Sequence, residues 1–208
     1  MNNPAVRSPY IDPAVEKILL LAAMPRQALF LDRDGVINID HGYVHRPEQT
    51  DWLPGIFELC RKAKNEGMLL IVVTNQAGIG RGYYSEEQFL EYSAWVHQVF
   101  SEQGAPLLAT YYCPHHPEAA VGEYLTACHC RKPQPGMLQT AMRDWGIDPA
   151  LSLMIGDKDS DMQAAQTSGL SFSLEVEERL PAWEFLRIKT ATKGLTSADF
   201  AGIRLVEN

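Results

Sequence analysis

Two carboxylates separated by a single residue, Asp32 and Asp34, are the side chains of this sequence best suited to chemistry. They end a short apolar run, and burial there would make both charges costly unless a cation or a proton offset them. One carboxylate can attack phosphorus, while the other can protonate the leaving oxygen and later activate water. A magnesium ion, which takes few carboxylates plus water and phosphate oxygens, would complete such a site. A surface turn is the alternative for this motif, because aspartate and Gly35 are turn formers.

Two further clusters carry groups that hold a phosphate. Thr74-Asn75-Gln76 follows the strongest apolar run of the chain, and its hydroxyl and backbone amides can bind a phosphoryl oxygen. Lys132 lies between Arg131 and Pro133, where it can present a fixed positive charge. Capping of a strand end and an ordinary basic surface position are the alternatives for these two clusters.

The fourth cluster is the acidic run at residues 156–161, which reads GDKDSD. Asp157 comes at the predicted end of a strand, which suits a metal ligand. For Asp159 we favour capping of the helix that follows. The role of Asp161 stays open.

Cysteine and histidine gather in one short segment, with Cys113 and His115 at its start and Cys128 and Cys130 at its end. Thiolates and an imidazole are the ligands of a tetrahedral zinc site. The intervening residues 117–127 offer little core, so a metal would hold them together. A disulfide or free thiols are the alternative, and Cys60 is predicted to be a core residue.

The elements that must position these side chains follow an alternating pattern. Apolar runs predict strands at residues 28–31, 68–73, 108–112, 151–155 and 170–176. Helices are predicted at residues 54–66, 85–103, 136–145 and 160–168, each ending next to a glycine. This order predicts an α/β fold with a doubly wound, mainly parallel sheet, in which ligands bind at the carboxyl ends of the strands.

Composition limits the classes of partner. The chain has 208 residues, a net charge of −8 and a pI of about 5.2, which disfavours nucleic acid and anionic membranes as partners. The apolar run at residues 18–24 is too short to span a membrane and lacks the basic flank of a signal peptide, so it predicts a short helix. We expect a cytoplasmic protein with an N-terminal extension, residues 1–25, and one domain, residues 26–208.

Together the four clusters resemble the haloacid dehalogenase superfamily of phosphohydrolases over most of the chain. The resemblance implies that Asp32 is the nucleophile and Asp34 the acid and base. It implies that Thr74 and Lys132 stabilise the transferred phosphate. Magnesium would be held by Asp32, by the backbone carbonyl of Asp34 and by Asp157. No long insertion separates the clusters, so no large cap domain is expected.

Longer runs, DRDGVINIDHGYVH, TNQAGIGRGYY, YYCPHHP, CHCRKPQPGML and GDKDSDMQAA, are similar to the family of heptose 1,7-bisphosphate phosphatases. That resemblance implies a monomeric enzyme that produces heptose 1-phosphate for nucleotide-activated heptose and lipopolysaccharide. It implies structural zinc on Cys113, His115, Cys128 and Cys130, and Lys158 near the phosphate. The implied substrate-binding residues are Asp40, His41, Gly42, Tyr43, Thr74, Asn75, Gln76, Ala77, Arg131 and Lys132.

Three other functions fit part of the pattern. Histidinol-phosphate phosphatases share the zinc loop and all four clusters. Polynucleotide 3′-phosphatases share the Thr-Asn-Gln run and the later Arg-Gly, although the acidic charge of this chain argues against them. A non-catalytic module stapled by zinc is the third alternative. The glycine-rich run around Arg81 is either an anion-binding loop or a plain turn.

Overall fold

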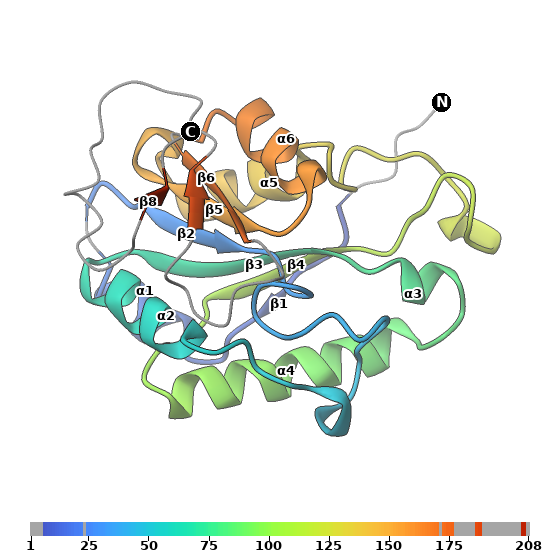
Figure 1. Ribbon diagram of the computed structural model, residues 1–208, viewed down its shortest axis with the longest axis horizontal. Helices are drawn as coiled ribbons and strands as arrows, with labels where there is room; N and C mark the ends of the chain where they lie inside the picture. The colour runs from blue at the N-terminus through green and yellow to red at the C-terminus, as the bar shows by residue number, and fades with distance from the viewer. Residues whose placement is uncertain (1–5, 23, 171, 177–185, 189–204, 207–208) are drawn as a thin grey trace.

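The computed structural model describes residues 6–22, 24–170, 172–176, 186–188 and 205–206. A central sheet is covered by helices on both faces (Figure 1). The order of its strands is β1-β4-β3-β2-β5-β6-β7-β8. This is the predicted α/β architecture, and no large cap is present among the described residues.

The centre of the sheet is parallel and corresponds to the five predicted strands. Its members are β2 (Ala28–Leu31), β3 (Leu69–Asn75), β4 (Ala109–Cys113), β5 (Leu153–Gly156) and β6 (Phe172–Val176). The order along the chain reverses between β2 and β5, which pair with each other. In doubly wound sheets this switch point is where ligands bind, beyond the carboxyl ends of the strands.

Alternate side chains of the central strands β2, β3 and β5 enter different cores. Leu29 and Leu31 of β2 pack with α2 (Ile56–Asn65) and α4 (Glu86–Glu102) on one face. Ala28 and Phe30 pack on the other face. The helices of that second face are α1 (Val15–Leu20), α5 (Gly136–Trp145) and α6 (Asp159–Thr167). Cys60 of α2 is fully buried, as predicted.

Local signals fix the ends of two predicted helices. The Ser85 hydroxyl accepts from the backbone of Gln88 and so caps α4, as the capping box predicts. Gly146 ends α5 in the left-handed conformation. The hypothesis that Asp159 caps α6 was wrong, because Lys158 holds that position and Asp159 lies in the first turn. The carboxylate of Asp161 accepts the backbone N–H of Lys158 instead.

Short elements join these layers. Contrary to the plain-turn alternative, part of the glycine-rich run forms a helical turn, α3 (Ala77–Gly80). Single 3-10 turns occur at Pro47–Gln49, Gly122–Tyr124 and Pro149–Leu151. Beyond β6, the short strands β7 (Leu186–Ile188) and β8 (Leu205–Val206) extend the sheet.

The N-terminal extension is packed on the domain. Its first element, β1 (Tyr10–Ile11), pairs antiparallel with β4 and was not predicted. Helix α1 begins and ends earlier than the predicted residues 18–24, and its Ile18 is buried in a core. The buried Asp12 carboxylate lies 3.1 Å from Nδ1 of His97. The extension is therefore tied to α4 by a polar contact and to the sheet by hydrogen bonds.

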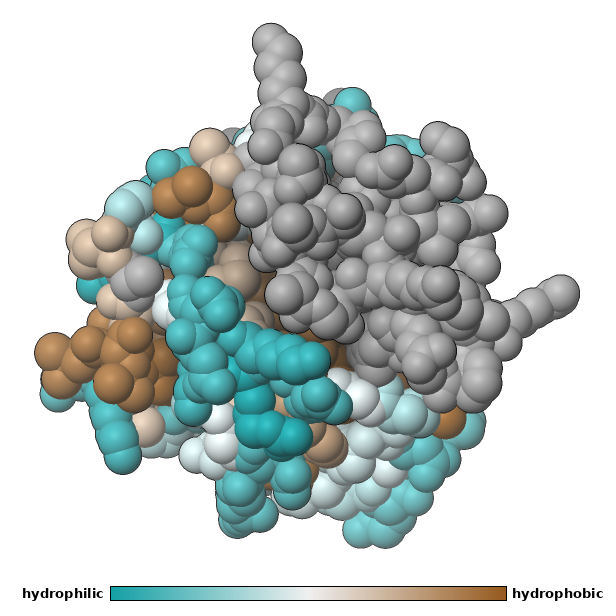
Figure 2. Space-filling model, turned by 60° about the vertical axis from the view of Figure 1, so that its left-hand side comes forward, coloured by the Kyte–Doolittle hydropathy of each residue, from teal (hydrophilic) through white to brown (hydrophobic). Residues whose placement is uncertain are grey.

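The surface in Figure 2 is mixed, with hydrophilic areas between smaller hydrophobic ones. Within the described part of the chain, no helix has the length and apolar character needed to cross a membrane.

Candidate active site

A cavity of about 330 Å³ opens where the central strands end. Residues from all four sequence clusters line it and are therefore neighbours in the fold. Its lining residues are Asp32, Asp34, Asp40, Gly42, Tyr43, Thr74, Asn75, Gln76, Ala77, Gly78, Tyr84, Lys132, Lys158, Ser160 and Asp161. Two of the predicted substrate-binding residues, His41 and Arg131, are not among them. His41 pairs with Asp51, and Arg131 donates to the backbone oxygen of His115.

Lys132 is the buried cation of the site. Its Nζ lies 2.9 Å from Oδ1 of Asp32 and 2.6 Å from Oδ1 of Asp161. It also donates to the backbone oxygen of Val73. The side-chain amide of Asn75 bonds both the N–H and the carbonyl of Lys132, so Asn75 holds the lysine in place. A lysine fixed in this way can face a phosphoryl group without reorganising.

Negative charge exceeds positive charge at the end of β2 and β5. Burial raises the pKa of Asp32 to about 7; Lys132 opposes this rise, and Asp161 and Asp157 add to it. Burial also raises the pKa of Asp157 to about 6. Burial alone would lower the pKa of Lys132, but the two neighbouring carboxylates outweigh it and raise that pKa. A site with these properties favours a bound cation.

The donor set fits magnesium. Carboxylate oxygens of Asp32, Asp157 and Asp161 lie within 4.8 Å of one another. Oδ1 of Asp157 is buried and has no hydrogen-bond partner among the described residues. Oxygen ligands of this kind are those that Mg²⁺ prefers. Asp161, whose role the sequence left open, thus lies in the acidic group.

Gly35 makes room for this group. Its φ is +89°, and an added Cβ would lie 2.3 Å from Oδ2 of Asp157. A side chain there would collide with the carboxylate. The conformation and the close approach both require glycine.

Asp34 is held by a partner that the sequence analysis missed. The Arg33 guanidinium donates to both oxygens of Asp34, at 2.9 and 2.7 Å, and Arg33 is itself buried. Burial raises the pKa of Asp34, but the Arg33 charge and the hydrogen bonds from Arg33, Asn38 and Gln76 outweigh it, so the pKa lies below its usual value. In the sequence, the position of Arg33 between two aspartates was the only sign of this contact.

Gln76 connects the two sides of the cavity. Its Nε2 donates to Oγ1 of Thr74 at 2.8 Å and to Oδ2 of Asp34 at 3.2 Å. The Tyr84 hydroxyl donates to Oε1 of Gln76. Thr74 and Asp34 are therefore fixed relative to each other before any ligand arrives.

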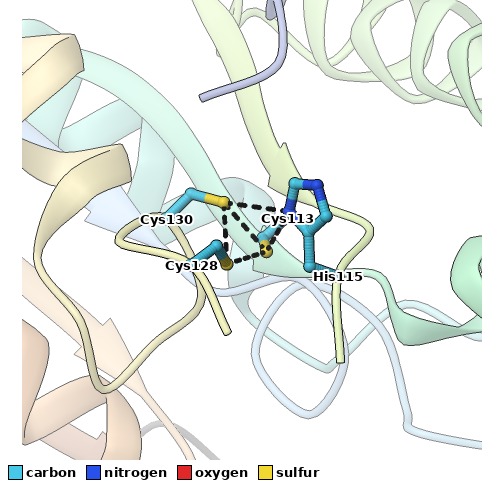
Figure 3. Close-up of side chains that lie close together, drawn as sticks. All are labelled: Cys113, His115, Cys128 and Cys130. Carbon is cyan, nitrogen blue, oxygen red and sulfur yellow. Dashed lines mark hydrogen bonds between the residues drawn. The ribbon is translucent and has the colours of Figure 1, made fainter. Parts of the chain in front are cut away.

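The cysteine and histidine cluster lies at the end of β4 (Figure 3). Its sulfur atoms are 3.1 to 3.5 Å apart, and Nδ1 of His115 lies 3.4 Å from Sγ of Cys130. Ligands about 2.0–2.3 Å from a tetrahedral zinc lie at comparable separations. All four cysteines of the chain are described and none is disulfide-bonded, so the disulfide alternative was wrong. The four side chains fit a zinc ion.

The cluster is joined to the catalytic cavity through the backbone. Cys130 comes two residues before Lys132, and Cys113 pairs with Asn75 across β3 and β4. A metal at the cluster would therefore fix the chain that carries Lys132.

Comparison with known proteins shows which family shares this sequence. A model described as "HAD-hyrolase-like" matches residues 129–174. The D-glycero-alpha-D-manno-heptose-1,7-bisphosphate 7-phosphatase of Burkholderia mallei is 52% identical over 156 residues, covering 75% of this chain and 82% of that protein. This chain belongs to the heptose 1,7-bisphosphate 7-phosphatase family. The Escherichia coli member, named for the beta anomer, is 44% identical over 74% of this chain and 81% of its own length.

Solved structures of phosphatases are similar to this fold. The heptose bisphosphate phosphatase of B. bronchiseptica, complexed with magnesium and phosphate, has a TM-score of 0.64 and 28% identity. The match covers 88% of this chain and 93% of that one. A HAD-like phosphatase from Mesorhizobium loti has a TM-score of 0.68 and 35% identity, over 73% of this chain and 76% of the other.

Proposed function

We propose that this chain removes the C7 phosphate of D-glycero-D-manno-heptose 1,7-bisphosphate through an aspartyl-phosphate on Asp32. The observation that carries the proposal is the meeting of Asp32, Lys132 and Asp157 at the switch point of the sheet. The names of the relatives supply the substrate. They do not favour histidinol phosphate, and the net charge of −8 argues against a nucleic-acid substrate.

The side chains divide the reaction into two steps. Asp32 attacks phosphorus while the bond from phosphorus to the C7 oxygen breaks, and Asp34 gives that oxygen a proton. Asp34 then takes a proton from the water that hydrolyses the aspartyl-phosphate. The products are heptose 1-phosphate and inorganic phosphate. Lys132 and Thr74 hold the phosphoryl oxygens during both steps.

The low pKa of Asp34 bears on the first step. Before substrate binds, Arg33 keeps this carboxyl ionised. A phosphate dianion close to Asp34 raises its pKa, because a second negative charge disfavours the ionised form, and Asp34 then takes up from solvent the proton that it gives to the C7 oxygen. The low value suits the later role of Asp34 as a base.

Magnesium, held by Asp32, Asp157 and either Asp161 or the backbone of Asp34, supplies positive charge that offsets the charge of the phosphoryl group. Zinc on the four-residue cluster serves structure. We further propose a monomeric, cytoplasmic enzyme that makes heptose 1-phosphate, a precursor of nucleotide-activated heptose for lipopolysaccharide, with no nucleic-acid or membrane partner.

Phosphate release tests the proposal. We expect the purified chain with magnesium to prefer one or both anomers of heptose 1,7-bisphosphate over histidinol phosphate and a 3′-phosphorylated oligonucleotide. Asp32→Asn should abolish release. Preference for histidinol phosphate would overturn the substrate, and unchanged release by Asp32→Asn would overturn the enzyme and favour a non-catalytic module.

A further inference from the structure

Tyr43 has an unusual backbone conformation. Its φ is +56°, a region that side chains other than glycine rarely adopt, and it lines the cavity. Such strain persists only where the surroundings fix it, and it often marks a functional position. Tyr43 is therefore a candidate substrate contact whose supporting groups matter.

Arg81 makes two contacts with this residue. Its Nη1 donates to the Tyr43 hydroxyl at 2.5 Å, and its Cζ lies 5.6 Å from the centre of the ring. Tyr83 adds an edge-to-face contact, with ring centroids 4.6 Å apart. The loop that carries Tyr43 is held at its other end by Lys158, which donates to Asp40 at 3.3 Å.

Arg81 itself has rigid support. It follows α3 directly, and its backbone N–H donates to Ala77. The backbone oxygen of Gly80 accepts from Val121, and a Cβ on Gly80 would lie 2.4 Å from the oxygen of Pro114. Helix α3 is thus packed against the segment that joins the halves of the cysteine cluster. Because its backbone is held in this way, Arg81 can hold the side chain of Tyr43 in one place.

Tyr43 lines the cavity, and Tyr83 packs against its ring from outside the lining. Tyr43 is 39% exposed and Tyr83 is 57% exposed, so the pair keeps apolar ring surface in contact with solvent. Aromatic faces offer apolar surface that packs against the C–H groups of a sugar.

We propose that Arg81 is a positioning residue that fixes Tyr43, and that Tyr43 and Tyr83 together select the sugar part of the substrate. The proposal rests on the proposed function for the identity of that sugar. Arg81 acts through Tyr43 and does not bind the second phosphate itself.

A double-mutant cycle tests the proposal. Arg81→Ala, Arg81→Lys, Tyr43→Phe, Tyr83→Ala and the double variant Arg81→Ala/Tyr43→Phe are assayed on heptose 1,7-bisphosphate, heptose 7-phosphate and p-nitrophenyl phosphate. We expect Arg81→Ala to raise KM for both sugars about tenfold with a smaller change in kcat. Tyr43→Phe should add nothing once Arg81 is removed, because coupled residues are not additive. Arg81→Lys should restore part of the loss.

Tyr83→Ala should raise KM for both sugars and leave KM for p-nitrophenyl phosphate nearly unchanged. Arg61→Ala, which removes an exposed arginine that bonds Gln103, is the control and should behave as wild type. Additive effects would show that Arg81 does not act through Tyr43, and a loss confined to the bisphosphate would show that Arg81 binds the second phosphate; either result would overturn the proposal. Failure of the wild-type enzyme to release phosphate from either sugar phosphate would instead overturn the proposed function. Thermal unfolding identifies any variant that fails to fold.

Discussion

Asp34 shows how a neighbouring charge sets the ionisation state of a mostly buried carboxyl. Burial would favour its neutral form, yet three hydrogen bonds from Arg33 and one each from Asn38 and Gln76 stabilise the carboxylate. The same contacts fix its direction. Loss of its charge should therefore harm chemistry more than folding.

We expect Asp34→Asn to lower kcat by about 100-fold or more, since the amide can neither donate nor accept the transferred proton. The amide is close in shape, so the midpoint of thermal unfolding should change far less. Phosphate release and unfolding measured on the same preparation check this. Undiminished turnover would remove Asp34 from the mechanism.

Comparison of Gly35→Ala with Gly169→Ala separates backbone strain from a collision between side chains. The new Cβ would press on the carboxylate of Asp157. Gly169 is the matched control, because its φ is +77° and an added Cβ meets nothing within 4 Å. Both variants bear a strain of about 1 kcal/mol. Only Gly35→Ala should weaken magnesium activation and lower kcat, by about tenfold or more. Equal kinetics in the two variants would contradict this.

At the scale of elements, the two ends of the segment between β4 and α5 meet at the cysteine cluster. We expect about one zinc ion per chain by metal analysis. Its removal by a chelator should lower the unfolding midpoint by about 5–15 °C, because binding energy at such sites is folding energy. Cys130→Ser should act in the same direction. A chain purified without metal and equally stable would refute the zinc site.

Helix α4 and the N-terminal extension meet at His97 and Asp12. Burial lowers the pKa of His97, and Asp12 only partly opposes it. The unfolded chain therefore binds a proton more readily near pH 6.5, so stability from this histidine is lost as the pH falls below that value. The pKa of Asp12 lies below 3.8 and adds no slope in this window.

We expect the urea unfolding midpoint of the wild type, measured relative to that of His97→Asn, to fall between about pH 7.5 and about pH 5.5. Asp32 and Asp157, whose pKa values are raised to about 7 and about 6, contribute the opposite slope in both proteins and cancel in this comparison. His41→Asn, which alters an exposed histidine, should keep the wild-type slope. An identical slope in His97→Asn would place the pH sensitivity elsewhere.

For the whole molecule, the N-terminal extension completes a sheet edge and one core. Without residues 1–25, β4 would lose its partner β1 and the core would lose Ile18. Deletion of these residues should lower the unfolding midpoint by about 5–10 °C and promote association through the exposed edge, with kcat little changed. Deletion of residues 1–5 alone is the control. Equal stability of both deletions would show that the extension is dispensable.

The order of strands and helices could be predicted from the sequence because the central strands β2, β3 and β5 are apolar runs whose side chains are buried on both faces. The sequence also predicted that Asp32, Thr74 and Asp157 lie close together, since a parallel sheet places the carboxyl ends of its strands at one edge. The cysteine cluster could be predicted because its ligands are chemically distinctive.

Only the tertiary structure decided which partners these residues have. The contacts of Arg33 with Asp34, of Asp161 with Lys132 and of Arg81 with Tyr43 involve residues whose types are common on protein surfaces. Strand β1 was missed because two residues carry too little periodicity to predict a strand. Local pattern determines which elements form, whereas burial and distance decide what each charged side chain faces.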